Sequence, residues 1–346
     1  MRRAADLHAC LLGGAIGDSL GLPYEALSAR RARRWSQGPL RHRFFFGRGM
    51  VSDDTDHTIF VAQALLRSGG NVDRFRAVLA WRLRCWLLSL PAGIGFGTLR
   101  GILKLWVGLK HSGVGSAGNA PAMRSSLLGC YFADDTSARR AHVSASTLLT
   151  HSDPRALAGA LAVAETAARI ARGEWRERPK PLAFAQAVTE VSDDERWRAL
   201  QPLLAEACGS ESPTQLLRAR LRVQKAVPGF VMCSVPFALL AWYEGHGDYA
   251  RTLRLCVDAG GDVDTHGAMA GALAAMVCGE AGIPPDLING YSDWPHGRRY
   301  LQELASALED PRSPCSTHFS PALFLRSPVF IAAVAAHGLR RMLPPY

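Results

Sequence analysis

The stretch GGDVDTHGAMAGALAAM, residues 260–276, decides how this sequence folds. Two leading glycines are followed by an acidic segment and then by small and apolar residues with helical spacing. Gly267, Gly271 and Ala274 fall on one face of that helix, where they let a neighbouring backbone approach closely. We therefore expect this helix to lie deep inside a bundle of other helices.

Helical spacing of apolar residues also dominates the rest of the chain. It predicts helices over residues 7–20, 55–68, 73–89, 119–132, 153–173, 180–192, 213–225, 232–244, 247–258, 265–280 and 297–309. Asp73 and Asp153 are the expected N-caps of two of them. Alternating apolar and polar residues are scarce, and no strand–helix alternation indicates a parallel sheet. The predicted fold is therefore all-α, a compact bundle of many helices.

Two of these helices begin with more negative charge than a helix start needs. A single acidic N-cap satisfies the free N–H groups and offsets the helix dipole. Here each start carries a pair of aspartates and a hydroxyl. The residues are Ser52, Asp53, Asp54 and Asp56 at the first start, and Asp262, Asp264 and Thr265 at the second. In an extended or turn segment, the one-residue spacing of the second pair sends both carboxylates to the same side.

A divalent cation would explain the excess charge. Aspartates that converge in a low-dielectric interior repel one another unless a counter-ion lies between them. Carboxylate and hydroxyl oxygens, without cysteine, are hard ligands suited to Mg²⁺, Ca²⁺ or Mn²⁺. Taken alone, each cluster is also compatible with an N-cap that carries surplus acid. The presence of both clusters, together with three further motifs, favours the metal site.

The first further motif is GGAIGDSLGLPYEA, residues 13–26. Gly13 and Gly17 lie about one helical turn apart in an apolar helix. Glycine inside a helix costs about 1 kcal/mol relative to alanine, so close packing or close ligand approach is expected there. The structural interpretation of the same segment is that Asp18 caps a helix or pairs with an arginine, and that Glu25 lies at the surface.

The other two motifs are a glycine-rich loop and a histidine. The loop, GVGSAGNAPAMRSSLLG (residues 113–129), leads into a helix, and its exposed N–H groups would form a cradle for phosphate. It is neither a P-loop nor a Rossmann fingerprint, because the pattern differs and no strand precedes it. The segment THSDPRA (residues 150–156) places His151 just before a helix start. A lone histidine in such a place is more often structural than catalytic.

These five motifs, in this order, resemble the ADP-ribosylglycohydrolase family over roughly residues 8–280. The family pattern opens with G-x-x-x-G-D-x-x-G and a following Glu, and continues with a hydroxyl-Asp-Asp-Thr cluster. A Gly-Asn loop ending in Ala-Met-Arg, a Thr-His-x-Asp-Pro segment and a late Gly-Asp-x-Asp-Thr complete it. The resemblance implies an all-α fold with two Mg²⁺ or Mn²⁺ ions at its centre.

The resemblance also implies roles for individual residues by matching position. The implied metal ligands are Ser52, Asp53, Asp54, Asp262, Asp264 and Thr265. The residues implied to hold ADP-ribose are Ser116, Gly118, Asn119 and His151. The carboxylates expected to carry catalysis are Glu25, Asp53 and Asp264, with Glu25 or Asp53 orienting or deprotonating the attacking water.

The sequence departs from the family pattern at several positions, none of which removes a ligand. Ser52 replaces the commoner threonine and keeps the hydroxyl, and His57 stands where glutamine is frequent. Ala120 and Pro121 follow the Gly-Asn pair in place of small residues or glycine, which narrows that loop. Val263 replaces a commoner threonine between the two aspartates.

The activity implied is hydrolysis at the anomeric carbon of the distal ribose of ADP-ribose, through an oxocarbenium-like transition state. The expected substrate is an ADP-ribosylated protein or a small molecule that contains ADP-ribose. Two alternatives stay open: a non-catalytic ADP-ribose-binding protein, and an immunity protein that blocks a toxin by occlusion. All six metal-ligand positions implied by the resemblance keep a suitable residue, which argues against a protein that has lost its catalytic activity. A nucleic-acid binder is not expected, because no reading helix or stacking platform is recognisable.

Composition sets the remaining bounds. The chain has 346 residues and a net charge of +10, which favours solvated basic helix faces and leaves an acidic ligand or partner as the alternative. Its eight cysteines are scattered through apolar segments without a C-x-x-C pair, which fits free thiols in a reducing cytoplasm. No signal peptide and no transmembrane segment are expected.

The last part of the chain differs from the rest in composition. We expect residues 1–310 to form the ADP-ribosylglycohydrolase-like catalytic domain, and residues 311–346 to form a C-terminal appendage. The appendage contains the apolar stretch PVFIAAVAAHGLRRML, which is too short to span a bilayer. It is expected to be helical and to dock on the core or on a protein partner, with a membrane surface as a further alternative.

Overall fold

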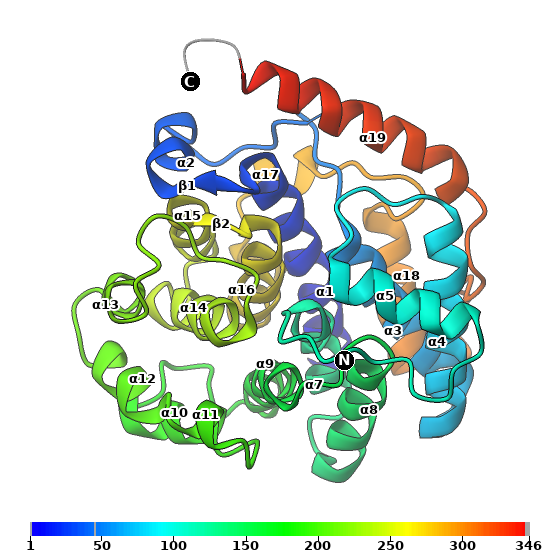
Figure 1. Ribbon diagram of the computed structural model, residues 1–346, viewed down its shortest axis with the longest axis horizontal. Helices are drawn as coiled ribbons and strands as arrows, with labels where there is room; N and C mark the ends of the chain where they lie inside the picture. Colours follow the sequence, from blue (N-terminus) through cyan, green and yellow to red (C-terminus); the bar gives the residue numbers. More distant parts are fainter. Residues whose placement is uncertain (1, 45, 343–346) are drawn as a thin grey trace.

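The centre of the fold is a pair of helices, α1 (Arg2–Gly21) and α16 (Val263–Cys278), in a computed structural model that describes residues 2–44 and 46–342 (Figure 1). The two helices meet backbone to backbone. A Cβ added to Gly17 would lie 2.0 Å from the carbonyl oxygen of Gly267, and one added to Gly267 would lie 2.4 Å from that of Gly17. The predicted deep burial of this glycine-containing helix is therefore confirmed.

The other elements surround this pair, and the all-α prediction is confirmed. Helices α14 and α15 contact α16, whereas α3, α7 and α18 contact α1. The elements are η1 (Leu22–Tyr24), β1 (Leu27–Ser28), α2 (Ala29–Trp35), α3 (Asp53–Ser68), α4 (Val72–Leu88), α5 (Phe96–Trp106), α6 (Ala120–Met123), α7 (Ser126–Tyr131), α8 (Thr136–Leu148), α9 (Pro154–Arg172), α10 (Pro181–Thr189), α11 (Glu195–Arg198), α12 (Gln201–Cys208), α13 (Pro213–Arg220), α14 (Val231–Glu244), α15 (Tyr249–Ala259), β2 (Gly260–Gly261), η2 (Glu280–Gly282), α17 (Pro285–Gly290), α18 (Arg298–Glu309) and α19 (Leu323–Arg340).

The helix starts test the predicted caps. Asp153 is the N-cap of α9, and its side chain accepts a hydrogen bond from the backbone N–H of Arg155. The prediction for Asp73 is wrong: α4 begins earlier, and Asn71 is its N-cap, accepting from Arg74 N at 2.8 Å. Asn and Asp cap equally well, so local sequence did not separate the two positions.

Some helices differ from the sequence expectations. The predicted helix over residues 119–132 is two short helices, α6 and α7, because the backbone leaves helical geometry at Arg124. Helices α2, α5, α8, α11, α12 and α17 were not predicted. Glycines flank and interrupt α5, which concealed the helical spacing of its buried residues Thr98, Ile102 and Leu105.

A two-stranded antiparallel sheet, which the sequence did not predict, ties two motifs together. It pairs Leu27 with Gly261 and Ser28 with Gly260. Gly261 has a φ of +91°, and a Cβ there would lie 1.9 Å from the carbonyl oxygen of Val227, so only glycine fits. The pairing brings the segment that follows Glu25 beside the segment that precedes Asp262.

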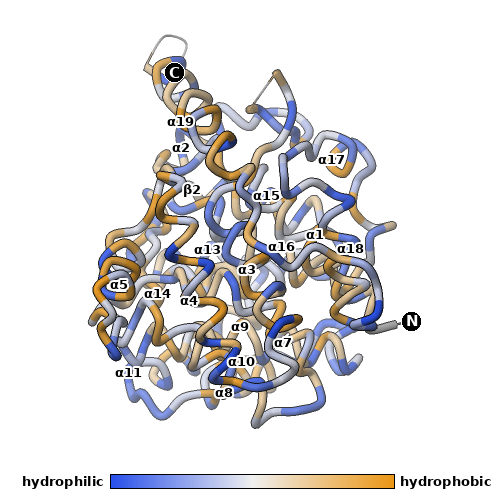
Figure 2. Tube along the Cα trace, turned by 90° about the vertical axis from the view of Figure 1, so that its right-hand side faces the viewer, coloured by the Kyte–Doolittle hydropathy of each residue, from blue (hydrophilic) through white to orange (hydrophobic). Residues whose placement is uncertain are grey.

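The C-terminal helix α19 lies at the edge of the molecule, where Figure 2 shows it as a largely hydrophobic segment. Among the described residues it is the one helix long and apolar enough to cross a membrane, by length and composition only. Its side chains nevertheless contact the body of the protein: Arg326 forms an ion pair with Asp56, and Phe330 packs against Leu22 and Phe44.

Candidate functional site

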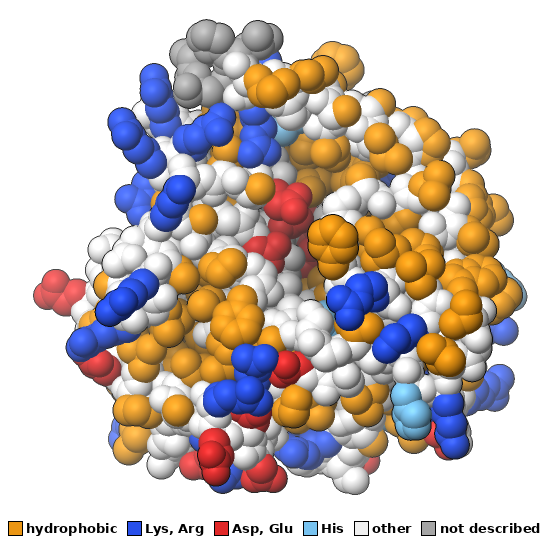
Figure 3. Space-filling model, viewed as in Figure 1, with side chains coloured by type: hydrophobic (Ala, Val, Ile, Leu, Met, Phe, Trp, Pro, Cys, Tyr) orange, Lys and Arg blue, Asp and Glu red, His pale blue; other side chains and the backbone are white. Residues whose placement is uncertain are grey.

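Acidic side chains gather in a hollow near the centre of the face shown in Figure 3. The carboxylates of Asp18, Asp54 and Asp264 offer oxygen atoms that lie within 4.8 Å of one another, and so do those of Glu25, Asp262 and Asp264. Asp264 belongs to both sets. The structure therefore joins the two acidic helix starts, which the sequence analysis paired on charge alone.

Asp18 connects α1 to the start of α3. Its carboxylate accepts hydrogen bonds from Ser52 N at 3.0 Å, from Thr55 N at 3.2 Å and from the Thr55 hydroxyl at 2.6 Å. Asp18 thus caps α3 from a different helix, as one interpretation of its motif held. It also lies in a carboxylate set, a role that the sequence analysis did not assign to it. Its place directly after Gly17, at the close helix contact, was the available signal.

Asp54 and Asp264 each have a carboxylate oxygen that is buried and lacks a hydrogen-bond partner. The other oxygen of Asp54 accepts from the hydroxyl groups of Ser52, at 3.0 Å, and Thr265, at 3.2 Å. Among the described residues, no lysine or arginine forms an ion pair with Asp54 or Asp264. A buried carboxylate oxygen without a donor is costly, so these two atoms are open to a ligand such as a cation.

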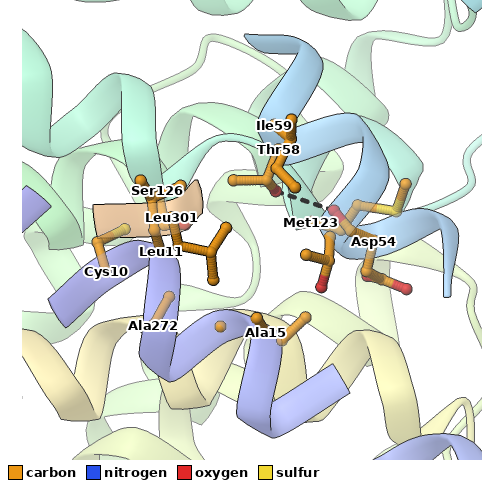
Figure 4. Close-up of a pocket in the computed structure, with 13 residues that line it drawn as sticks. Cys10, Leu11, Ala15, Asp54, Thr58, Ile59, Met123, Ser126, Ala272 and Leu301 are labelled. Atoms are coloured by element: carbon orange, nitrogen blue, oxygen red, sulfur yellow. Dashed lines mark hydrogen bonds between the residues drawn. The ribbon is translucent and has the colours of Figure 1, made fainter. Parts of the chain in front are cut away.

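The protein interior behind Asp54 offers no room for that ligand. Figure 4 shows the side chains that line this region, most of them apolar, including Leu11, Ile59 and Leu301. The cavity there has a volume of about 10 Å³, roughly the smallest space that holds one water molecule. A cation would therefore have to bind on the other side of Asp54, among the carboxylates.

The electrostatics of the cluster also favour a cation. Burial, together with the repulsion of neighbouring carboxylates, raises the pKa values of Asp54 and Asp264 well above the ordinary range. Burial raises the pKa of Asp18 to about 7, although its hydrogen bonds act in the opposite direction. A divalent cation would relieve this repulsion, and the oxygen-only donors are those that Mg²⁺ and Mn²⁺ prefer. The residues present therefore fit such an ion.

Glu25 and Asp53 lie at the edge of the cluster. Both are half-buried, and both line a cavity of about 120 Å³ that also touches Ser52 and Asp264. Burial is the main cause of the raised pKa of each, with Asp262 adding to it at Glu25 and Asp18 at Asp53. Asp53 belongs to neither set of closely spaced carboxylates, so the structure places it beside the predicted ligands rather than among them.

The predicted substrate loop divides into two parts. Asn119 turns towards the carboxylates, where its side-chain amide donates to Asp262 at 2.5 Å and to the Ser234 hydroxyl at 2.7 Å. Ser116 and Gly118 lie near His151 instead: a Cβ on Gly118 would be 3.0 Å from His151 Nε2 and 3.7 Å from Ser116 Oγ. The loop therefore joins the acidic cluster to a second, uncharged group of side chains.

His151 is held in a buried setting by its neighbours. Its Nδ1 lies 2.9 Å from the Thr150 hydroxyl, and burial with the nearby Arg124 charge lowers its pKa to about 3. Arg124, the arginine of the Ala-Met-Arg motif, is itself buried and donates to Ser146 and Thr150. Arg124 thus fixes the segment that carries a neutral His151.

Asp56 belongs to a different cluster, although the sequence analysis counted it with the excess charge of its helix start. Its carboxylate lies 2.8 Å from His296 Nδ1 and accepts from Arg326 Nη1 at 3.2 Å and from Trp86 Nε1 at 3.1 Å. Arg326 also donates to Asp293 at 3.0 Å. Because Arg326 and His296 compensate its charge, the pKa of Asp56 falls to about 2 despite its burial.

The chain is similar to known proteins over most of its length. Residues 2–317 match the family described as ADP-ribosylglycohydrolase. The chain is 30% identical over 304 residues to the Escherichia coli protein YegU, described as uncharacterized, covering 80% of this chain and 89% of that one. It is 28% identical over 315 residues to an uncharacterized protein of Archaeoglobus fulgidus, covering 86% and 94% respectively.

A solved structure shares the fold. It is described as an ADP-ribosylglycohydrolase-related protein complex, and its superposition has a TM-score of 0.66 at 23% sequence identity. The match covers 89% of this chain and 98% of that one. At this level of identity the similarity concerns the fold alone.

Proposed function

The chain belongs to the ADP-ribosylglycohydrolase family, and we propose that it is a hydrolase that uses two divalent cations, Mg²⁺ or Mn²⁺. The bond cleaved is the N- or O-glycosidic bond at the distal ribose of ADP-ribose. The substrate releases ADP-ribose together with the group that was attached to it.

One observation carries this proposal: Asp264 is shared by two sets of carboxylates, and among the described residues no lysine or arginine forms an ion pair with Asp54 or Asp264. A shared carboxylate between two oxygen-rich sets is the arrangement expected of a two-metal site. Asp18, Asp54 and Asp264 would hold one ion, and Glu25, Asp262 and Asp264 the other. The hydroxyl groups of Ser52 and Thr265 already point at Asp54, so they complete the donor set. When bound, the cations supply Lewis acidity towards the ribose hydroxyls and a water molecule.

The residues of the loop bind the rest of the substrate in this proposal. Ser116, Gly118 and the neutral His151 offer hydrogen bonds without adding charge, and Gly118 leaves space for a phosphate close to the backbone. The half-exposed ring of Phe230 lies beside the loop, because Phe230 pairs with Gly118 and lies under the guanidinium of Arg155. A ring in that position suits stacking of the adenine base.

The proton of the attacking water goes to a carboxylate at the edge of the cluster. Glu25 and Asp53 both line the cavity next to Asp264, so either carboxylate is placed to accept that proton. Two isosteric variants, Glu25→Gln and Asp53→Asn, distinguish them. If Asp53 accepts the proton, Asp53→Asn loses turnover but keeps its affinity for Mn²⁺. If Glu25 accepts it, Asp53→Asn keeps turnover, whereas Glu25→Gln loses both turnover and Mn²⁺ affinity because it also removes a proposed metal ligand.

The experiment that tests the proposed function is a substrate panel with the purified protein. ADP-ribose linked to arginine, serine, aspartate or glutamate, and a nucleobase is incubated with Mg²⁺, with Mn²⁺ and with a chelator. We expect metal-dependent release of ADP-ribose from at least one linkage. Calorimetric titration with ADP-ribose runs alongside, because binding without release from any linkage would contradict hydrolysis and favour a non-catalytic binding protein.

A further inference from the structure

We propose that α19 forms the leaving-group side of the site and restricts the enzyme to small leaving groups, so that ADP-ribose on a protein surface is excluded. This inference rests on the proposed function and adds the substrate class to it. The residues that match the family end at residue 317, before α19 begins at Leu323, so α19 lies outside the matched part of the chain.

The carboxylate cluster has two edges, and they face different parts of the protein. At one edge, Asp262 accepts a hydrogen bond from the side chain of Asn119. Asn119 lies at the end of the glycine-rich loop. At the other edge, Glu25 and Asp53 border the 120 Å³ cavity. If the loop holds the phosphates and the cations hold the distal ribose, the group attached to that ribose extends into this cavity.

Helix α19 forms the far wall of the cavity. The residues of α19 and its C-cap that line it are Phe330, Val334, His337, Gly338 and Arg341. Leu22, Phe44 and Ala92 add further apolar surface. The cavity is thus acidic at its floor and mostly apolar or aromatic along its walls, where Arg341 adds one guanidinium group. Its volume is well below the roughly 300–1,000 Å³ of pockets that enclose drug-sized ligands, so it suits a compact and partly apolar or planar group.

The wall is attached to the body of the protein at both ends. At the N-terminal end, the buried guanidinium of Arg326 donates to Asp56, Asp293 and the carbonyl oxygen of Val51. This carbonyl directly precedes Ser52, so α19 is bonded to the segment that carries the cluster. A helix fixed there cannot swing aside without separating a buried arginine from two aspartates, which is strongly unfavourable.

The C-terminal end is attached next to Glu25. Arg341 donates to the carbonyl oxygen of Glu25 at 3.0 Å, and His337 Nε2 lies 3.0 Å from the carbonyl oxygen of Pro23. The His337 ring also packs against Trp35 and Phe44, with centroid distances of 4.7 Å to each. With both ends fixed, α19 stands where a protein surface attached to the ribose would have to lie.

Paired substrates with one linkage and two leaving-group sizes test this inference. The pairs are ADP-ribosyl-arginine with a protein ADP-ribosylated on arginine, and ADP-ribosyl-serine with a protein ADP-ribosylated on serine. The α and β anomers of NAD add a planar leaving group. At least one linkage is expected to be cleaved. For that linkage, we expect kcat/KM to be at least about ten-fold higher for the free amino-acid substrate than for the protein-linked one, because α19 excludes the protein.

A matched pair of substitutions tests the position of the wall. Val334→Phe fills the cavity and is expected to lower kcat/KM for small substrates by about ten-fold or more, while the affinity for ADP-ribose, which lacks the leaving group, stays within about two-fold. Ala335→Phe adds a similar bulk to the exposed face of the same helix and is expected to change neither quantity. Val334→Ala enlarges the cavity and should favour larger leaving groups, which keeps the test usable if Val334→Phe folds poorly.

The outcomes separate this inference from the proposed function. Equal kcat/KM for the free and protein-linked forms of one linkage would overturn the role of α19 and leave the hydrolase intact. A Val334→Phe variant that loses ADP-ribose affinity in parallel with turnover would do the same, because α19 would then face the ADP-ribose moiety. Absence of release from every substrate would overturn the proposed function and this inference together.

Discussion

Asp54 and Asp56 lie two residues apart on α3, and their surroundings shift their pKa values in opposite directions. Both are buried. The carboxylate of Asp56 faces Arg326 and His296, which together hold its pKa at about 2. Asp54 faces other carboxylates, and its pKa is raised well above the ordinary range. Burial is the same for both, so the difference comes from what each side chain faces.

This difference separates a structural ion cluster from a binding site. A carboxylate that the chain neutralises with its own arginine needs nothing from outside. A cluster whose buried carboxylates face mainly one another is stabilised by a bound cation or by bound protons. The Asp56 cluster therefore holds α3 and α19 together, whereas the Asp54 cluster is the one that we propose binds a cation and the substrate.

The largest effect is expected for Asp264→Asn, which removes the carboxylate shared by both sets. We expect the affinity for Mn²⁺ to fall at least about 100-fold and the release of ADP-ribose about 1,000-fold or more. The melting temperature of the metal-free protein should stay the same or rise, because one repelling charge is lost. Calorimetric titration, a turnover assay and thermal unfolding measure the three quantities. Full turnover of this variant in a chelator would contradict the scheme.

Removing the positive charge that compensates Asp56 should destabilise the protein. Arg326→Met leaves Asp56 and Asp293 buried without their arginine, and we expect the free energy of unfolding to fall by about 3–5 kcal/mol. Arg299→Met is the control, because it removes an exposed arginine paired with Glu303 and should cost less than about 0.5 kcal/mol. Urea unfolding of both variants gives the comparison, and equal losses would show that Arg326 is not a structural cation.

The two clusters should also respond oppositely to pH. Groups with a raised pKa, such as Asp18 at about 7, contribute stability at low pH that is lost as the pH rises through that value. Mg²⁺ binds the deprotonated carboxylates, so the stability that it adds should grow by at least about 1 kcal/mol from about pH 5.5 to 8. The stabilising contribution of Asp56 stays constant in this range and is lost only as the pH falls towards 2.

Unfolding curves with and without saturating Mg²⁺ at each pH measure this effect. Buried histidines with a lowered pKa, such as His151 and His266, take up protons on unfolding whether or not Mg²⁺ is present. Their contribution to the pH dependence therefore cancels when the two unfolding free energies are subtracted. A Mg²⁺ contribution that does not change with pH would mean that the ion does not bind the carboxylates with raised pKa values.

The smallest effect is expected at Ser52, which caps α3 and donates to Asp54. Ser52→Ala should lower the free energy of unfolding by about 1 kcal/mol, as for other lost N-caps. Ser52→Thr keeps the hydroxyl and should retain most of the stability and the Mn²⁺ affinity. If threonine is as damaging as alanine, the side-chain volume at this position matters more than the hydroxyl.

The sequence predicted the features that depend on neighbouring residues. The helical spacing around Gly267 and Gly271 indicated a buried helix, and the paired aspartates at 53–54 and at 262 and 264 indicated excess charge at two helix starts. Asp153 was recognisable as a cap because a cap and the N–H that it accepts from lie within a few residues. Such signals are local, so they can be read without knowing the fold.

The tertiary structure decided which charges are compensated and what covers the site. Arg326 reaches Asp56 across 270 residues of sequence, and Asn119 reaches Asp262 across 143. No spacing rule links such distant positions, because the packing of α1 against α16 and of α19 against the core brings them together. The sequence by itself therefore determined where carboxylates gather at helix starts. Only the folded structure determined that Asp56 faces a cation, that Asp54 faces other carboxylates, and that α19 stands beside Glu25, because electrostatic energy depends on distances in space.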